Sequence, residues 1–151
     1  MGHAVTNILG ATIDEMELAM SMHEQADCPV EHRFVPGMYI RQMTLLAGTL
    51  ATSMTHRFEH PFVILKGKIQ VISENEGPVT YTAPYFGITQ PGTRRMAYAL
   101  EDTIWITLHP TEETDIEKIA EAILEPHDNP LLGSSGNEQW RLSLPPKQLT
   151  E

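Results

Sequence analysis

The chain has 151 residues, enough for one domain with its own core, since a chain of this length buries about two-thirds of its unfolded surface. Its formal net charge of −10 argues against nucleic-acid phosphates as partners, because binding to them depends on clustered Lys and Arg. No apolar run approaches the roughly 20 residues that span a bilayer, and the first residues lack the basic flank of a secretory signal. We therefore expect a soluble, cytoplasmic protein that binds neither nucleic acid nor membrane.

The first region, residues 1–32, is predicted to be helical. Thr12-Ile13-Asp14-Glu15 is a capping-box pattern, in which a hydroxyl and a carboxylate satisfy free N–H groups at a helix start. Apolar residues follow at helical spacing, and Pro29 ends the segment. The residues of this face are Ile13, Met16, Ala19, Met20 and His23. The single cysteine, Cys28, has no partner for a disulfide or a zinc site and is interpreted as a small buried residue.

Between residues 33 and 110 the pattern changes to short runs rich in β-branched and aromatic residues. Turn signals such as Ala47-Gly48, Lys66-Gly67 and Pro91-Gly92 separate them. The run over 68–72 alternates polar and apolar residues, as in a sheet with one face toward the core. Runs of this length and spacing are typical of an antiparallel sandwich or barrel. The expected strands are 38–46, 49–56, 62–65, 68–73, 79–82, 86–90, 95–100 and 103–108.

A second helix is predicted in residues 111–126. Thr114-Asp115-Ile116-Glu117 is another capping box, apolar residues follow at helical spacing, and Pro126 ends the segment. Residues 127–151 are expected to form an extended tail, because turn-forming residues dominate them. Three apolar residues of the tail would fix it to the barrel or to a neighbouring subunit, and partial disorder is the alternative. They are Trp140, Leu142 and Leu144.

The segment from Gly48 to Gly67 carries the most informative pattern. His56 and His60 stand four residues apart, just before a buried-looking strand that ends at a glycine turn. This spacing resembles the first motif of the cupin superfamily, which runs Gly, five residues, His-X-His, three or four residues, Glu, six residues, Gly. Aligned on Gly67, His60 falls at the Glu position, His56 at the second His and Met54 at the first His.

A second stretch, residues 90–96, is similar to the other cupin motif, a Pro-X-Gly turn followed by His. Pro91 and Gly92 match the turn, and Arg95 stands where the His would be. The resemblance covers residues 36–109. It implies a mainly β fold: a cupin double-stranded β-helix, or jelly-roll barrel, flanked by an N-terminal and a C-terminal helix. It further implies a small single-domain cupin-like protein with a degenerate metal motif, of the kind found in bacteria and phages.

The histidines are the expected metal ligands. A divalent site of the cupin kind needs three or four N/O donors from neighbouring strands. His56 and His60 offer two, and His109, at the end of the last expected strand, is the best third. Imidazole donors suit Zn, Fe, Ni or Mn. Arg95 argues the other way, because a guanidinium cannot ligate a cation and repels it. A metal site, a metal-free pocket and a filled barrel therefore all stay open.

The arginines suggest an anionic ligand. Arg95, together with Arg94, suits a carboxylate or phosphate, which a guanidinium grips with two hydrogen bonds. The alternative is a surface role, in pairs with Glu101 or Asp102. The expected ligand-binding residues are Arg95, Arg94, Tyr98 and Met54.

These features predict a small-molecule-binding cupin, metal-dependent through His56 and His60, that binds or acts on a small polar or anionic ligand. The sequence names no catalytic residue and leaves open whether the protein is an enzyme, since it carries no recognisable catalytic motif. Without a metal, a His would act as acid or base on a carbohydrate or similar substrate, as the resemblance to metal-independent cupin epimerases and isomerases implies. The alternative is a non-catalytic scaffold with a structural, assembly or regulatory role, including a phage-encoded accessory protein. A homodimer is expected, because sheet edges need covering.

Overall fold

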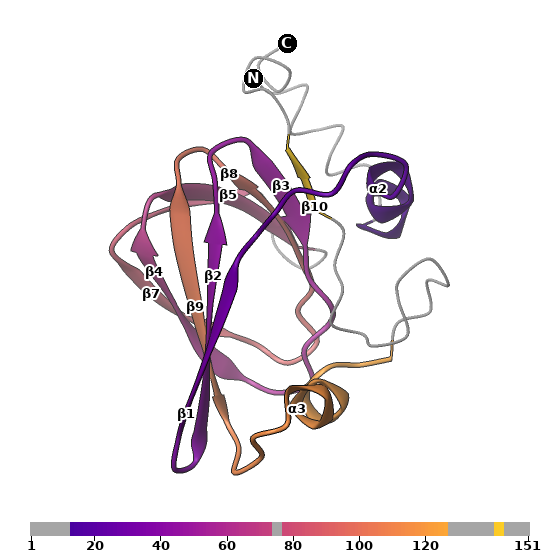
Figure 1. The fold of residues 1–151 in the computed structure, drawn as a ribbon. Helices are drawn as coiled ribbons and strands as arrows, with labels where there is room; N and C mark the ends of the chain where they lie inside the picture. The colour runs from indigo at the N-terminus through magenta and orange to yellow at the C-terminus, as the bar shows by residue number, and fades with distance from the viewer. Residues whose placement is uncertain (1–12, 74–76, 127–140, 144–151) are drawn as a thin grey trace.

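The computed structural model describes residues 13–73, 77–126 and 141–143, the last of these by backbone alone. Two antiparallel five-stranded sheets face each other, with one helix outside the barrel and one at its end (Figure 1). The first sheet has the order β1 (Val30–Val35), β2 (Met38–Leu45), β9 (Thr103–Pro110), β4 (His60–Lys66) and β7 (Tyr85–Thr89). The second has the order β10 (Arg141–Ser143), β3 (Thr49–Thr52), β8 (Arg95–Ala99), β5 (Lys68–Ser73) and β6 (Val79–Thr82). The helices are α2 (Ile13–Met20) and α3 (Ile116–Ile123).

The eight predicted strands are all present, most with bounds that differ by no more than two residues, and there are two larger changes. The expected strand over 49–56 stops at Thr52, and His56 contributes only an isolated bridge with Leu124. An additional strand, β1, begins at Val30, inside the region expected to be helical. It is an edge strand that pairs with β2 and is exposed along most of its length, so it shows no strong apolar alternation in the sequence.

The core lies between the two sheets and is built from the inward residues of each strand. The ring of Phe62 stacks on Trp105 with centroids 5.0 Å apart, and Tyr81 meets Phe62 edge-on. Ile64 and Ile69 are completely buried beside them. Cys28 lies in the same cluster, as expected of a small buried residue.

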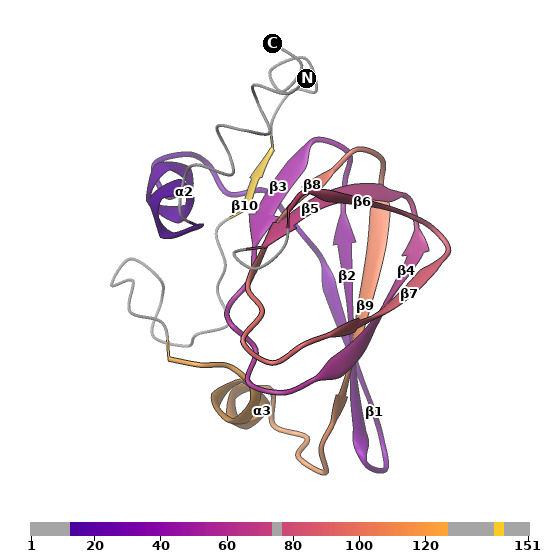
Figure 2. The same ribbon diagram turned by 180° about the vertical axis from the view of Figure 1, so that it is seen from behind.

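Helix α2 covers the outer face of the second sheet (Figure 2). Its apolar residues pack on the outward residues of β3 and β8 in a second cluster formed by Ile13, Met16, Met20, Leu50, Met96 and Tyr98. The expected apolar face is partly wrong, because Ala19 and His23 are exposed and Glu17 takes a buried position instead. The reason is an ion pair between Glu17 and Arg94, described below.

Helix α3 closes one end of the barrel (Figures 1 and 2). It begins one residue later than expected, since Asp115 and not Thr114 is the N-cap. The Asp115 carboxylate accepts hydrogen bonds from the backbone N–H groups of Glu117 and Lys118. In the part of the chain that the structure describes, no helix is long and apolar enough to cross a membrane.

The tail returns to the barrel at residues 141–143. Strand β10 pairs with β3, with Leu142 opposite Leu50. This matches the expectation that the tail is fixed to the barrel at this point, whereas Trp140 and Leu144 lie outside the described residues.

Candidate functional site

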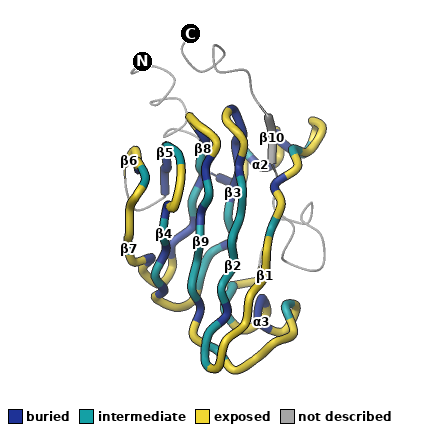
Figure 3. Tube along the Cα trace, turned by 60° about the vertical axis from the view of Figure 1, so that its left-hand side comes forward, coloured by how far each residue is buried: buried dark blue, intermediate teal, exposed yellow. Residues whose placement is uncertain are grey.

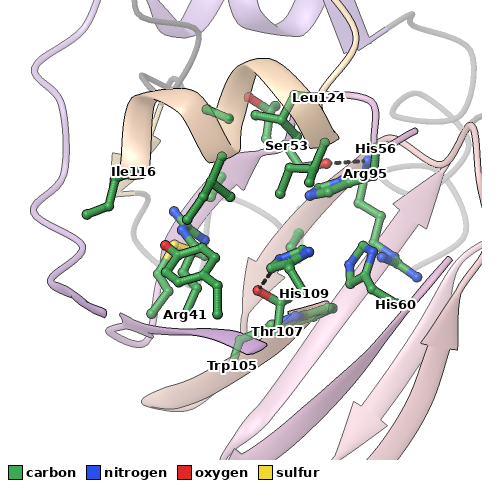
Figure 4. A pocket seen from close by; sticks show the side chains of 18 of the residues that line it. Arg41, Ser53, His56, His60, Arg95, Trp105, Thr107, His109, Ile116 and Leu124 are labelled. Carbon is green, nitrogen blue, oxygen red and sulfur yellow. Dashed lines mark hydrogen bonds between the residues drawn. The ribbon is translucent and has the colours of Figure 1, made fainter. Parts of the chain in front are cut away.

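A cavity opens at the end of the barrel beneath α3 (Figure 4). Residues of both sheets and the apolar face of α3 line it, and the centre of a water-sized sphere can reach about 100 Å³ of the space inside. The mouth of a β-barrel is a common place for a small-molecule site. The cavity therefore has the position of such a site.

Three histidines meet at this cavity, and His56, His60 and His109 are called the histidine cluster below. One possible ligand atom from each lies within 4.8 Å of the other two. The ring centroids are 4.7 Å apart for His56 and His60, 4.4 Å for His60 and His109, and 5.8 Å for His56 and His109. The cluster also lines a second hollow beside the exposed residues Phe58 and Glu59, so it can be approached from outside the barrel as well as from within.

Strand register explains why these residues meet. Strands β4 and β9 are antiparallel neighbours with Phe62 opposite Thr107, and continuing this register puts His60 opposite His109. Both side chains face inward, because they are two residues from inward partners and side chains in a strand alternate. His56 reaches the cluster from the segment between β3 and β4, where its backbone N–H donates to the carbonyl of Thr93.

Each imidazole has one nitrogen engaged with the protein. His60 Nδ1 lies 3.1 Å from the carbonyl of Phe58, and His109 Nε2 lies 2.9 Å from the hydroxyl of Thr107. The ring of His56 is hydrogen-bonded to the backbone of Met54. Such contacts fix the orientation of a metal-binding imidazole and leave its second nitrogen for the metal.

Burial keeps the cluster neutral. Burial is the largest cause that lowers the pKa of His56 and of His109, each to about 3. The positive potential of neighbouring His60 and Arg41 lowers both pKa values further. Burial also lowers the pKa of His60. Neutral imidazole is the form that ligates a metal, so the cluster is in its ligating form at pH 7.

The donor set fits a divalent transition metal. Tetrahedral bonds of about 2.1 Å place ligand nitrogens about 3.4 Å apart, so the ligand atoms, which lie within 4.8 Å of one another, need to approach by at most about 1.4 Å. Three imidazoles suit Zn, Fe, Ni or Mn. The opposing influence is the positive charge of Arg41 and Arg95, both of which line the same cavity.

Comparisons with known proteins agree with this architecture. No protein-family model matches the sequence, and no curated protein matches it. Among solved structures, an uncharacterized conserved protein with a double-stranded β-helix domain from Klebsiella pneumoniae is similar, with a TM-score of 0.50 and 12% identity over 62% of this chain and 84% of that one. The chain has the double-stranded β-helix fold of the cupins. The cupin fold predicted from the sequence is thereby confirmed.

Other similar structures have lower scores. One is an RmlC-like cupin family protein from Methanocaldococcus jannaschii, with a TM-score of 0.48 and 12% identity over 57% of this chain and 82% of that one. Another is an acetylacetone dioxygenase from Acinetobacter johnsonii, with a TM-score of 0.46 and 18% identity over 55% of this chain and 59% of that one. Identities this low concern the fold and leave the function of this barrel to its own residues.

The positions aligned with the cupin motifs reach the site in part. His56, His60 and Arg95 line the cavity, and Gly48, Gly67 and Gly92 all adopt positive φ. At Gly67, a Cβ would come within 2.3 Å of the carbonyl oxygen of Asp102, so only glycine fits this turn. The turns of the motif are thus preserved more completely than its ligands.

Three of the expected ligand-binding residues do not line the cavity. Tyr98 faces outward from β8 and packs against α2, because Arg95 and Ala97 occupy the inward positions of that strand. Met54 is buried and also lies outside the lining. Arg94 points to α2, where it pairs with Asp14 and Glu17 and not with Glu101 or Asp102.

Arg41 is the site residue that sequence reasoning missed. It stands at an inward position of β2 with Tyr39 and Met43, and all three line the cavity. A signal was present, since in 38–45 the alternate residues Tyr39, Met43 and Leu45 are apolar and Arg41 interrupts them. A charged residue at a core position of a strand indicates a pocket.

Proposed function

We propose that this protein binds a small polar or anionic molecule in its cupin barrel, at a divalent metal ion held by the histidine cluster. The observation that carries the proposal is the meeting of three neutral imidazoles, from β4, from β9 and from the segment before β4, with their possible ligand atoms within 4.8 Å. Zn, Fe, Ni or Mn suits these donors. When bound with an open coordination position, such a metal acts as a Lewis acid toward an oxygen atom of the ligand.

The protein's own residues provide the rest of the site. Thr107 and the carbonyl of Phe58 hold the rings of His109 and His60 in place. Helix α3 excludes water from one wall, because its apolar residues face the cavity. Its C-terminal end is hydrogen-bonded next to the cluster: the backbone N–H of Arg57 donates to Ile123 O at 2.7 Å, and its Nε donates to Leu124 O at 2.9 Å. These hydrogen bonds therefore hold the end of α3 next to the segment that carries His56.

The metal is tested by elemental analysis of protein purified without a histidine tag. We expect about one equivalent of a transition metal in the wild type, and loss of it in His56→Ala, His60→Ala and His109→Ala, because two imidazoles hold such an ion poorly. His23→Ala is the matched control, since His23 is exposed and outside the cavity, and it should retain the metal. Absence of metal from the wild type, even after reconstitution with each of the four ions, would overturn the proposal.

A second candidate function, an assembly role as a homodimer, is favoured by the outer face of the first sheet. Outward positions of β2, β9, β4 and β7 are uncharged except for Lys66 at the end of β4, and Phe86 and Ile88 are 65% and 43% exposed. Of the described elements, neither helix lies over this face (Figure 3). The outward residues are Ile40, Gln42, Thr44, Ile104, Ile106, Leu108, Pro61, Val63, Phe86 and Ile88. Charged residues stand only at its margins, as Lys66 on β4 and as Glu31 and Arg33 on β1. In a chain of net charge −10, a face with an uncharged apolar centre is where two copies meet with least repulsion.

Light scattering coupled to size exclusion tests the homodimer. The wild type should have twice the mass of the chain, and Ile106→Lys or Phe86→Lys should reduce it to a monomer. Lys118→Glu, a charge change on α3, is the control and should leave the mass unchanged. A wild type that runs as a monomer at high concentration would remove this assembly role and leave the metal proposal untouched.

A further inference from the structure

The charge lining the cavity is opposite in sign to that of the whole chain. Among the described residues that line it, Arg41 and Arg95 carry a permanent positive charge and none is Asp or Glu. The chain as a whole has a net charge of −10. A concave site lined by one sign of charge attracts ligands of the other sign.

Arg95 is held in place by contacts that keep its positive charge. Its guanidinium carbon lies 5.0 Å from the centroid of the Phe62 ring and 5.8 Å from that of Trp105. Its Nη1 donates to the hydroxyl of Thr89 at 2.8 Å, and its backbone N–H donates to Ser53 Oγ. An arginine oriented by ring faces and a hydroxyl is well suited to receive a planar anion, since little conformational freedom is left to lose.

Arg41 adds a second cation from the other sheet. It lines the cavity from β2 of the first sheet, whereas Arg95 lines it from β8 of the second, and Figure 4 shows the two side chains apart. In the strand register Arg41 lies opposite Thr107, whose hydroxyl holds His109. The guanidinium of Arg95 lies over the ring of Phe62, which is opposite Thr107 on the other side. Both arginines therefore stand beside the histidine cluster and line the same cavity.

The remaining walls are mainly apolar. Helix α3 contributes Ile116, Ile119 and Ile123, its C-cap is Leu124, and the sheets contribute Met43 and Trp105. Ser53, Thr107 and Tyr39 have their hydroxyl groups engaged with Arg95, His109 and His32, so that of Thr52 is the one unpartnered hydroxyl among the described lining residues. A phosphate needs more donors than a carboxylate to satisfy its oxygens, whereas an apolar wall stabilises the body of an organic molecule.

We propose that the ligand of this site is a small organic acid, with its carboxylate bound by Arg41 and Arg95 and its apolar part against α3. This rests on the proposed small-molecule function of the barrel and names its ligand class. It does not depend on the metal, because neither arginine can ligate one.

Calorimetry with benzoate as the probe tests this, with benzamide as its uncharged counterpart and inorganic phosphate as the alternative anion. The tag-free protein is used both with its metal and after treatment with a chelator, so that binding to the metal is separated from binding to the arginines. We expect benzoate to bind at least about tenfold more tightly than benzamide in both forms. Phosphate should bind more weakly than benzoate.

Variants of Arg41 and Arg95 test whether these side chains bind the carboxylate. Arg95→Met and Arg41→Met should each weaken benzoate binding about tenfold and leave benzamide unchanged, whereas Arg95→Lys, which keeps the charge, should retain part of the affinity. Arg33→Met is the control, because Arg33 is exposed on β1. Metal content and thermal unfolding of each variant report whether the fold is intact.

The outcomes separate this inference from the metal proposal. No benzoate binding by the wild type, equal binding of benzoate and benzamide, tighter binding of phosphate, or full affinity in both methionine variants would each overturn the organic-acid ligand. If metal is bound but benzoate is not preferred, only the ligand class is wrong. If benzoate binding persists in protein that never holds metal, only the metal proposal is wrong.

Discussion

The ion pairs that attach α2 to the barrel allow a buried and an exposed interaction of one arginine to be compared. Arg94 Nη2 lies 2.5 Å from Glu17 Oε1, and Arg94 Nη1 lies 2.7 Å from Asp14 Oδ1. The Glu17 side chain is 2% exposed and the Asp14 side chain 63% exposed. The helix and the cation are the same in both pairs, so the main difference between them is contact with water.

This difference predicts unequal losses of stability. Arg94→Met leaves the Glu17 carboxylate buried without its cation, which costs about 3–5 kcal/mol. Asp14→Asn removes only the exposed pair and should cost about 1 kcal/mol or less. At about 2–4 °C per kcal/mol for a chain of this size, the midpoint should fall by roughly 6–20 °C in the first variant and by at most about 4 °C in the second.

Urea unfolding followed by circular dichroism measures both free energies. Hydrogen exchange of the α2 amides is recorded alongside it, because α2 can detach while the barrel stays folded. The double variant Arg94→Met/Glu17→Leu should recover most of the loss, since replacing both partners of a buried pair with apolar residues is often close to neutral. The reasoning is refuted if Arg94→Met and Asp14→Asn cost the same, or if Arg94→Met changes neither the barrel nor the exchange of α2.

Three further predictions concern the barrel itself. Phe62→Ala should cost about 3–5 kcal/mol, because Phe62 is 2% exposed and stacks in the core. Leu46→Ala, at a 56% exposed position, should stay within about 0.5 kcal/mol; urea unfolding compares them. Gly67→Ala should cost more than Gly92→Ala in the same assay: both have positive φ, worth about 1–2 kcal/mol, but only at Gly67 would a Cβ meet a backbone carbonyl at 2.3 Å. Equal costs would contradict this. Metal-free protein should lose stability as the pH falls from about 6.5 toward 3, because the histidines of the cluster have lowered pKa values and the unfolded chain takes up protons first. The free energy of unfolding should fall less steeply with pH in His109→Gln. An unchanged slope in this variant would contradict the prediction.

The barrel could be predicted from the sequence because local signals and overall fold agree. Glycines at positive φ form the turns between the strands. Along the strands apolar and polar residues alternate, because one face of each sheet lies in the core and the other lies outside. Strand β1 could not be predicted, since an exposed edge strand lacks that alternation. The capping signal before α3 was correct in kind but one residue early, because Thr114 and Asp115 are both good N-caps and the choice depends on how the chain enters the helix from β9.

The site was only partly predictable, because it is assembled across strands. His56 and His60 stand in a recognisable spacing, whereas His109 is close to them only through the pairing of β9 with β4. Arg41 comes from β2, the other neighbour of β9. Its residue type marks an unusual inward position, but the sequence does not show which pocket that position faces.

The adjacent arginines show how a sheet separates roles that look alike in a sequence. From the sequence, Arg94 and Arg95 are expected to bind one ligand, yet the pleat sends them to opposite faces: Arg94 to α2 and Arg95 to the cavity. Ser53 contacts both, accepting Arg94 Nε at its carbonyl and the Arg95 backbone N–H at its hydroxyl. A helix outside the barrel is therefore anchored one residue away from the cation that faces the ligand. It follows that Arg94→Met should act mainly on stability and Arg95→Met mainly on binding of an organic acid. Equal effects of both variants on both measurements would mean that this segment moves as one unit and that the two faces are not independent.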